Sequence, residues 1–430
     1  MSLIKRIRNS KFIRSSATLM SGSLVAQLIT VVSAIVLARI YTPDQMGVYT
    51  LVLTAESLFG GIMCLRYEVA IVTEKSEEKV FPIIKLCSII VIFLSVCFSI
   101  GYGWVNFVNN PELSQYSYLI VFILIMLLSH GTINILEAYN NRRQEYKLMT
   151  STYVLRTSVQ NGGAILLGLL KCGIVGLVGA HTIGSLSGVN RQAKSIVKEK
   201  DKIISSSGDQ VKSAALENKN LPLYSSPAVF ANRYSYSSIS LFINQLFGAA
   251  ALGFYSISYK ALGLPLTVLS NNISKVFFKD ATKEFHNNGN FKKTFNRTVV
   301  LLIIMSIPLG VIIYFAAPIF IKLLLGEKWL VAADYIRILL PMFLIRLVVN
   351  TIAYGLQIVN KQKFELLFQI LLVLASVSAY FIVKGSGWNI AEYLKVINYS
   401  FSIVYVIYFL SVMYYAYKGK GDSVSLESKD

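Results

Sequence analysis

Charged residues are scarce in this chain, and most of them carry the same sign. Only 15% of the 430 residues are charged and 54% are hydrophobic, whereas a soluble domain has about 25% charged residues. This composition excludes a soluble globular protein and a disordered polybasic chain. The net charge is +19, but no stripe of basic residues alternates with aromatic ones outside the apolar segments. We therefore expect no nucleic-acid binding.

Residues and motifs for covalent chemistry are few. The 4 cysteines lack CxxC spacing, so we predict neither a zinc site nor a redox pair and interpret them as small buried residues. His130 and His181 stand alone in apolar segments and are interpreted as structural. The GxSxG, HExxH and P-loop motifs are absent from the sequence. We expect a protein that is not an enzyme and that binds no metal or cofactor.

Long apolar runs recur along the whole chain. A membrane-spanning helix needs about 20 mainly apolar residues. The first run follows a basic start, but it is too long for a signal peptide and has no cleavage site, so we expect it to be retained. By this measure the chain has twelve predicted spans, at 17–38, 46–66, 83–107, 117–138, 152–170, 173–190, 227–247, 250–278, 298–324, 332–358, 364–383 and 392–416.

Lysine and arginine residues gather in alternate connections between these spans. Cytoplasmic loops of membrane proteins are enriched in these residues, so the pattern predicts that both termini are cytoplasmic. The segments predicted on that side are 5–14, 75–85, 142–147, 191–219, 275–297, 361–363 and 418–429. The connections on the other side hold only Lys171, Lys322, Lys328, Lys384 and Lys395.

The chain also divides into two similar halves. The motif ARIYTPDQMGVY at 38–49 aligns without a gap with NQLFGAAALGFY at 244–255, although chance is an alternative because such turns are common in membrane proteins. Repeats of six spans each would share one orientation, related by an axis along the membrane normal. We predict a six-helix bundle at 1–190, a flexible cytoplasmic linker rich in Lys, Ser and Asn at 191–221, a second bundle at 222–417 and a cytoplasmic tail at 418–430.

Several basic residues fall inside the predicted spans, where each costs roughly 2.5 to 3.5 kcal/mol at the bilayer centre. They are predicted to face a water-filled cavity between the halves, and buried ion pairs are the alternative. Excess positive charge suits an anionic substrate, above all a phosphate. Glu56 is the acid deep in a span, and it either pairs with a cavity arginine or binds a coupling cation, H⁺ or Na⁺. The candidate substrate-binding residues are Arg39, Arg66, Arg156, Arg233, Lys260 and Arg346.

Three stretches carry a resemblance to a known family. They read SGSLVAQLITVVSAIVLARIYTPDQMGVYTLVL, then LRYEVAIV, then LPLYSSPAVFANRYSYSSISLFINQLFGAAALGFYSISYKALGLPLTVLSNNISKVFFKDATKEF. They resemble the polysaccharide transporter branch of the MOP flippase superfamily, the Wzx-type O-antigen and capsule repeat-unit flippases. The resemblance covers the chain from about Ser21 to Tyr417 and identifies the family better than the sugar.

This resemblance implies an all-α polytopic membrane protein with two six-helix bundles in a V around a central cavity. It implies a flippase of the bacterial cytoplasmic (inner) membrane that moves undecaprenyl-diphosphate-linked oligosaccharide between leaflets by alternating access. The products served are O-antigen and lipopolysaccharide, capsule or exopolysaccharide. Expected partners are this substrate, membrane lipids, and a polymerase and chain-length regulator of the pathway.

The family's diphosphate-binding role for basic residues is carried onto Arg39, Arg66, Arg233 and Lys260, whereas Arg156 and Arg346 are inferred from their depth alone. From the count of twelve spans we expect no counterpart of the extra C-terminal helix pair of fourteen-helix relatives such as the lipid II flippase. Two other functions stay open at this point: a membrane polymerase or ligase of lipid-linked polysaccharide, and a MATE-like small-molecule or cation antiporter.

Overall fold

The protein is helical throughout the part of the chain that the structure describes. The computed structural model describes residues 11–359, 361 and 363–418, with side chains from residue 22 onward, and these residues form no strand. They fall into two compact units, which divide between Arg233 and Tyr234. The predicted basic residues Lys5, Arg6 and Arg8 and the tail from 419 onward lie outside the described residues.

Unit 1 contains the predicted first bundle and the segment after it. Within it α7 packs against α2 and α8, and α5 packs against α6. Its helices are α2 (Lys11–Ile40), α3 (Pro43–Phe59), α4 (Glu68–Thr73), α5 (Glu77–Gly103), α6 (Leu119–Arg142), α7 (Tyr146–Leu169), α8 (Gly173–Leu186), α9 (Val189–Val197), α10 (Lys200–Ser205) and α11 (Gly208–Glu217), with short turns η1 (Gly60–Ile62), η2 (Trp104–Val108), η3 (Ser114–Tyr116) and η4 (Leu221–Ser225).

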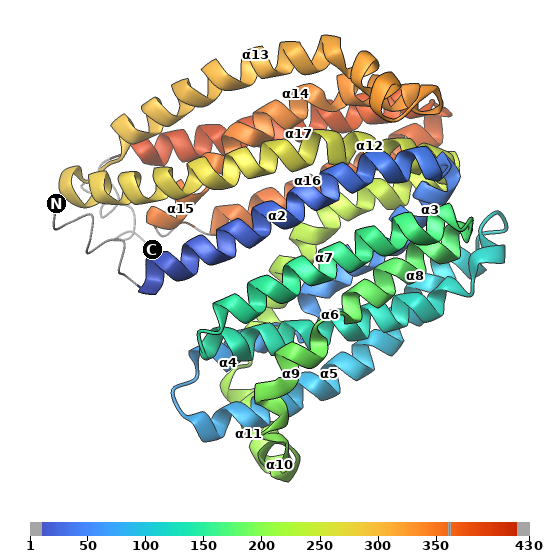
Figure 1. Ribbon diagram of the computed structural model, residues 1–430. Helices are drawn as coiled ribbons and strands as arrows, with labels where there is room; N and C mark the ends of the chain where they lie inside the picture. The colour runs from blue at the N-terminus through green and yellow to red at the C-terminus, as the bar shows by residue number, and fades with distance from the viewer. Residues whose placement is uncertain (1–10, 360, 362, 419–430) are drawn as a thin grey trace. The chain divides into compact units, whose positions relative to one another are not determined.

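Unit 2 consists mainly of five long helices. Figure 1 shows α13, α14 and α17 side by side, and α16 packs against α17. The elements are α12 (Ser226–Asn288), which begins in unit 1, α13 (Lys292–Leu324), η5 (Glu327–Trp329), α14 (Leu330–Ile352), α15 (Tyr354–Ile358), α16 (Lys363–Ser386) and α17 (Ile390–Tyr417).

Each of the twelve predicted spans corresponds to a helical segment. Among the described residues, 8 segments are long and apolar enough to cross a membrane, and one of them, Leu221–Asn288, contains two predicted spans. The other three predicted spans are α3, which has 17 residues, α8, which has 14, and α7, which is rich in Ser, Thr, Asn and Gln. Of the cysteines, Cys64 and Cys87 are buried as predicted, whereas Cys97 and Cys172 are exposed.

The predicted repeat coincides with a break between the first two helices of each half. In unit 1, Thr42 caps α3 in a capping box with Gln45, and Pro43 is the first helical residue. In unit 2, Gly248 interrupts α12 with φ 80° and ψ 179°, a conformation open mainly to glycine. Thr42 and Gly248 are separated by the same offset as the two aligned motifs. The two halves thus turn at equivalent positions by different local devices.

The segment at 191–221 differs from the flexible linker that its composition predicts. It forms α9, α10 and α11, and α11 packs against α5. Gly188, at φ 82°, turns the chain from α8 into α9, and Asn140 on α6 donates to the Gln192 carbonyl. Gln192 in α9 is buried, and its side-chain amide donates to the Thr152 hydroxyl.

Basic and acidic residues from three connections meet at one end of unit 1. Lys79 Nζ lies 2.9 Å from Glu217 Oε2, and Arg142 Nη2 lies 3.0 Å from Glu77 Oε2. Lys85 donates to the Ile204 carbonyl at 2.8 Å. The segments 75–85, 142–147 and 191–219, which the charge pattern assigns to the same side of the membrane, therefore lie together.

Candidate functional site

Glu56 on α3 lies at the centre of a polar cluster inside unit 1. Its Oε1 is 3.0 Å from Nδ1 of His130 on α6, and its Oε2 is 2.8 Å from Nε2 of His181 on α8. Nδ1 of His181 is in turn 3.0 Å from the Tyr49 hydroxyl. We call Tyr49, Glu56, His130 and His181 the acid–imidazole cluster. Hydrogen bonds through this cluster join α3, α6 and α8.

Helix geometry and small residues place these groups together. Tyr49 and Glu56 are two turns apart on α3, so they share one face. A Cβ at Gly60 would lie 2.7 Å from Nε2 of His130, so the absence of a side chain there makes room for the imidazole. Asn134, one turn after His130, donates to the Gly60 carbonyl at 2.9 Å. The end of α3 is thereby fixed against α6.

Two of the candidate substrate-binding arginines are paired with carboxylates. Arg66 Nη1 lies 3.0 Å from Glu68 Oε1, and Arg156 Nη1 lies 3.7 Å from Glu137 Oε1. The alternative of a buried ion pair is therefore the one observed for Arg156. Opposite charges that stay together inside a protein compensate each other's loss of hydration, so these two arginines have local partners without a substrate.

The other candidates have different surroundings. Arg39 is exposed near the end of α2, and Lys260 is half-buried on α12. Arg233 Nη1 donates to the Ser57 carbonyl at 3.2 Å, and a Cβ at Gly61 would lie 3.2 Å from its Nε. Arg233 therefore lies beside the end of α3 that carries Glu56.

Arg346 on α14 is surrounded by aromatic rings in unit 2. Its guanidinium carbon lies 4.3 Å from the ring centre of Tyr236, 5.6 Å from that of Phe343 and 6.0 Å from that of Tyr259. Nη1 donates to the Tyr259 hydroxyl at 3.2 Å, and the Tyr236 and Tyr405 hydroxyls are 2.9 Å apart. We call Arg346 with Tyr236, Tyr259 and Tyr405 the arginine–tyrosine cluster.

The charge of Arg346 has no acidic partner within the described part of the chain, where the ion pairs involve other arginines and lysines. A cavity of about 10 Å³, the size of one water, lies beside it. Polar groups of Thr267, Ser270 and Asn350 line this cavity. Arg346 thus has aromatic rings and a small hydratable space among its neighbours.

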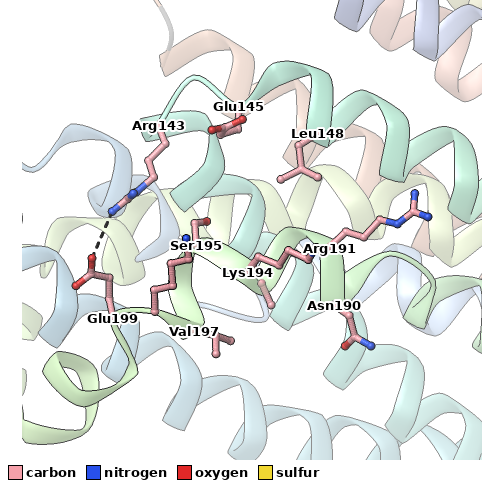
Figure 2. A pocket seen from close by; sticks show the side chains of 11 residues that line it. Arg143, Glu145, Leu148, Asn190, Arg191, Lys194, Ser195, Val197 and Glu199 are labelled. Carbon is pink, nitrogen blue, oxygen red and sulfur yellow. Dashed lines mark ion pairs between the residues drawn. The ribbon is translucent and has the colours of Figure 1, made fainter.

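A larger pocket, of about 780 Å³, lies in unit 1 between α9 and the turn from α6 to α7. Both basic and acidic residues line it, and Arg143 Nη2 is 3.9 Å from Glu199 Oε1. Figure 2 shows Arg191 directed away from this pair. The hydrogen bond from Lys202 holds the pKa of Glu199 below its ordinary value, and Arg143 acts in the same direction. None of the predicted site residues lines this pocket.

Comparison with known proteins identifies the family. The model of a family described as polysaccharide biosynthesis protein matches residues 36–334, more than half of the chain. The chain belongs to this family. A curated relative, the teichuronic acid biosynthesis protein TuaB of Bacillus subtilis (strain 168), is 26% identical over 119 residues, which are 28% of this chain. The match spans only 25% of that relative's length.

Solved structures show the fold of this polysaccharide biosynthesis family member. The lipid II flippase MurJ in an inward closed conformation aligns with a TM-score of 0.72 and 14% identity, over 93% of this chain and 87% of that one. An inward-facing MATE multidrug resistance transporter of the MOP superfamily aligns with a TM-score of 0.65 and 13% identity, over 94% and 96% of the two chains. The predicted all-α fold is confirmed, and at the level of the fold the chain is similar to these MOP superfamily structures.

Apart from Tyr236, the residues of the two polar clusters lie on helices that come at equivalent places in the two halves of the chain. In unit 1 the acid–imidazole cluster lies on α3, α6 and α8, the second, fourth and sixth predicted spans. In unit 2 Tyr259, Arg346 and Tyr405 lie on the second half of α12, α14 and α17, which are again second, fourth and sixth. The repeat thus places a carboxylate with imidazoles in one unit and a guanidinium with phenols in the other.

Sequence reasoning missed the role of the histidines. It interpreted His130 and His181 as isolated, whereas both bind Glu56. One signal was available: Glu56 is the acid deep in the spans of the first half, and these two histidines are in spans of the same half. The family match, at 36–334, includes the acid–imidazole cluster and ends before Arg346.

Proposed function

We propose that this protein is a flippase that moves an undecaprenyl-diphosphate-linked oligosaccharide repeat unit from the cytoplasmic to the external leaflet of the bacterial inner membrane. Its product serves O-antigen and lipopolysaccharide, capsule or exopolysaccharide synthesis. The observation that carries this proposal is Arg346, a guanidinium at span depth with aromatic neighbours and no carboxylate partner among the described residues. Membership of the polysaccharide biosynthesis family supports the substrate class.

The chemistry of the arginine–tyrosine cluster fits the proposed head group. A planar guanidinium matches the oxygens of a phosphate with paired N–H donors. Tyrosine hydroxyls, such as those of Tyr236 and Tyr405, donate and accept hydrogen bonds, as sugar hydroxyls require. In this proposal the cluster binds diphosphate and sugar while the prenyl tail stays in lipid, and the two bundles alternate access to a central cavity. Arg39, Arg66, Arg156, Arg233 and Lys260 are the further candidate contacts.

The proposal assigns no covalent step to this chain. Solved proteins with this fold include a lipid II flippase and a multidrug transporter, so fold alone does not separate a flippase from a cation antiporter. A cation antiporter needs an acid free to hold its substrate, whereas both oxygens of Glu56 are engaged by imidazoles. The family and the Arg346 site therefore favour an anionic lipid-linked sugar.

The test is to delete the protein and determine in which leaflet the lipid-linked repeat unit accumulates. Accessibility of its sugar to a membrane-impermeant oxidant reports the leaflet in sealed vesicles of known orientation. A flippase predicts accumulation in the cytoplasmic leaflet, reversed by the intact gene. Normal translocation with unpolymerised units in the external leaflet would instead indicate the polymerase alternative and overturn the proposal.

A further inference from the structure

Both carboxylate oxygens of Glu56 are occupied by ring nitrogens, and a phenol follows on the far side of one ring. We propose that the acid–imidazole cluster is a proton-binding site that accepts up to two protons and couples transport to H⁺ and not to Na⁺. The coupling part of this inference rests on the proposed function, whereas the proton-binding part stands on the geometry alone.

The hydrogen bonds of the cluster can be kept in every protonation state. With Glu56 ionised and both rings neutral, Nδ1–H of His130 and Nε2–H of His181 donate to the carboxylate, and the Tyr49 hydroxyl donates to Nδ1 of His181. A proton added to His181 at Nδ1 turns this last bond round, so that the ring donates to the Tyr49 oxygen. A proton added to His130 enters at Nε2. The cluster charge then goes from −1 through 0 to +1.

Imidazole is suited to proton exchange near neutral pH, and one ring is accessible. The side chains of His130, Glu56 and His181 are 29%, 18% and 14% exposed. Nε2 of His130 forms no hydrogen bond among the described residues, because the single bond of this ring is the one from Nδ1 to Glu56. His130 is therefore the more exposed of the two rings, and its Nε2 is the nitrogen that would take up a proton.

The charged groups around the acid–imidazole cluster are one ion pair and one further arginine. Arg156 on α7 interacts electrostatically with both Glu137 and Glu56, and Glu137 on α6 also interacts with His130. Arg156 and Glu137 compensate each other at 3.7 Å. Beyond them, Arg233 on α12 approaches the Ser57 carbonyl. One acid with two imidazoles thus lies beside a neutral pair and one more cation.

The donor atoms disfavour a sodium ion. Hard cations bind several oxygen ligands from carboxylates, carbonyls and hydroxyls. Here each carboxylate oxygen of Glu56 faces a nitrogen at 2.8 or 3.0 Å. To bind a hard cation, Glu56 would have to give up both imidazoles, whereas a proton needs no change of partner.

Nuclear magnetic resonance of the full chain, labelled with ¹⁵N-histidine in lipid nanodiscs, tests proton binding directly. The chain has 3 histidines, and the exposed His286 is the internal control, assigned with His286→Gln. We expect the ring signals of both His130 and His181 to report protonation as the pH is lowered, without change on adding Na⁺. Glu56→Gln should alter the pH response of both rings, leaving His286 unchanged.

Three outcomes would overturn the inference: neither ring signal changes with pH, the signals change independently of Glu56, or Na⁺ alters their response to pH. Coupling is measured separately in proteoliposomes that contain the lipid-linked oligosaccharide. A pH gradient of one unit should raise the steady-state ratio of substrate between the two leaflets up to about tenfold per coupled proton, while a Na⁺ gradient has no effect. Glu56→Gln should lose this effect of the pH gradient, whereas His286→Gln should keep it.

These measurements separate the two proposals. If wild-type protein moves no oligosaccharide in any gradient while both ring signals report protonation, the proposed function fails and the proton site stands. If oligosaccharide moves but its ratio between the leaflets is independent of the pH gradient, the flippase stands and the coupling fails.

Discussion

Oε2 of Glu56 lies 2.8 Å from Nε2 of His181, so that the carboxylate on α3 is bonded directly to the ring on α8. The same carboxylate also binds His130 on α6. Three helices of unit 1 therefore share one charged centre. In unit 2 the guanidinium of Arg346 on α14 donates to Tyr259 on the second half of α12. The central charged group is thus an acid in unit 1 and a guanidinium in unit 2.

Removal of the ring from His181 should destabilise the protein. His181→Leu leaves a mostly buried oxygen of Glu56 without its donor, which costs about 1–3 kcal/mol. The double variant with Glu56→Gln should lose less than the sum of the two single variants, because the two residues act as a pair. Thermal unfolding in detergent measures this coupling. Fully additive losses would show that the bond contributes nothing, and His286→Gln serves as the neutral control.

A side chain at Gly60 should disturb the same cluster from outside. In Gly60→Ala the new Cβ would meet Nε2 of His130 at 2.7 Å, and overpacking of this kind costs about 1–3 kcal/mol. Gly162→Ala on α7 is the matched control, because a Cβ there meets nothing within 4 Å. The predicted result is a lower unfolding temperature for Gly60→Ala alone. Equal behaviour of both variants would show that His130 is not held in this position.

Substrate binding should depend more on Arg346 than on Arg337, which is on the same helix. Arg346→Gln should weaken binding of the lipid-linked diphosphate about 10- to 100-fold, as expected for a charge-assisted hydrogen bond of roughly 1.5–3 kcal/mol. Arg346→Lys should restore part of the affinity, because it keeps the charge and loses the planar fork. Arg337→Gln is the control, since Arg337 is on α14 but lies 3.8 Å from Asp334. Equal losses at both positions would contradict the assignment.

The packing of α11 against α5 should weaken as the pH falls. The hydrogen bond from Lys79 holds the pKa of Glu217 below its ordinary value, with Ser213 contributing. Because the pKa of Glu217 is lowered in the folded protein, its ion pair stabilises the fold fully above the ordinary glutamate pKa of about 4.3. This stabilisation is lost as the pH falls through the lowered pKa. Limited proteolysis at 191–221 should therefore be slow at neutral pH and faster in acid.

Charge exchange provides the control for this docking. Glu217→Lys should increase cleavage of the segment, and the swapped pair with Lys79→Glu should restore part of the protection, because the ion pair is re-formed. Rapid cleavage of the wild-type segment at neutral pH would support the flexible linker that the composition predicts.

Local patterns were sufficient for the helices and the turn positions. Hydropathy predicted each long helix, and the aligned motifs placed the breaks at Thr42 and Gly248. Which side chains form ion pairs could not be predicted, because this depends on which helix faces lie together. Arg156 pairs with Glu137, and His181 pairs with Glu56; in each pair the two residues come from different helices. The residues at 191–221 are helical, and hydrogen bonds with Asn140 and Thr152 hold Gln192 of this segment against α6 and α7.

The most direct measurement of the central claim is translocation of the lipid-linked oligosaccharide by the purified protein in proteoliposomes. A membrane-impermeant oxidant that reacts with the sugar reports how much substrate has reached the outer leaflet. The account predicts rapid equilibration across the bilayer with wild-type and Arg337→Gln protein, and a strong loss of rate with Arg346→Gln. Substrate that stays in its original leaflet with wild-type protein, or crosses equally fast with Arg346→Gln, would contradict it.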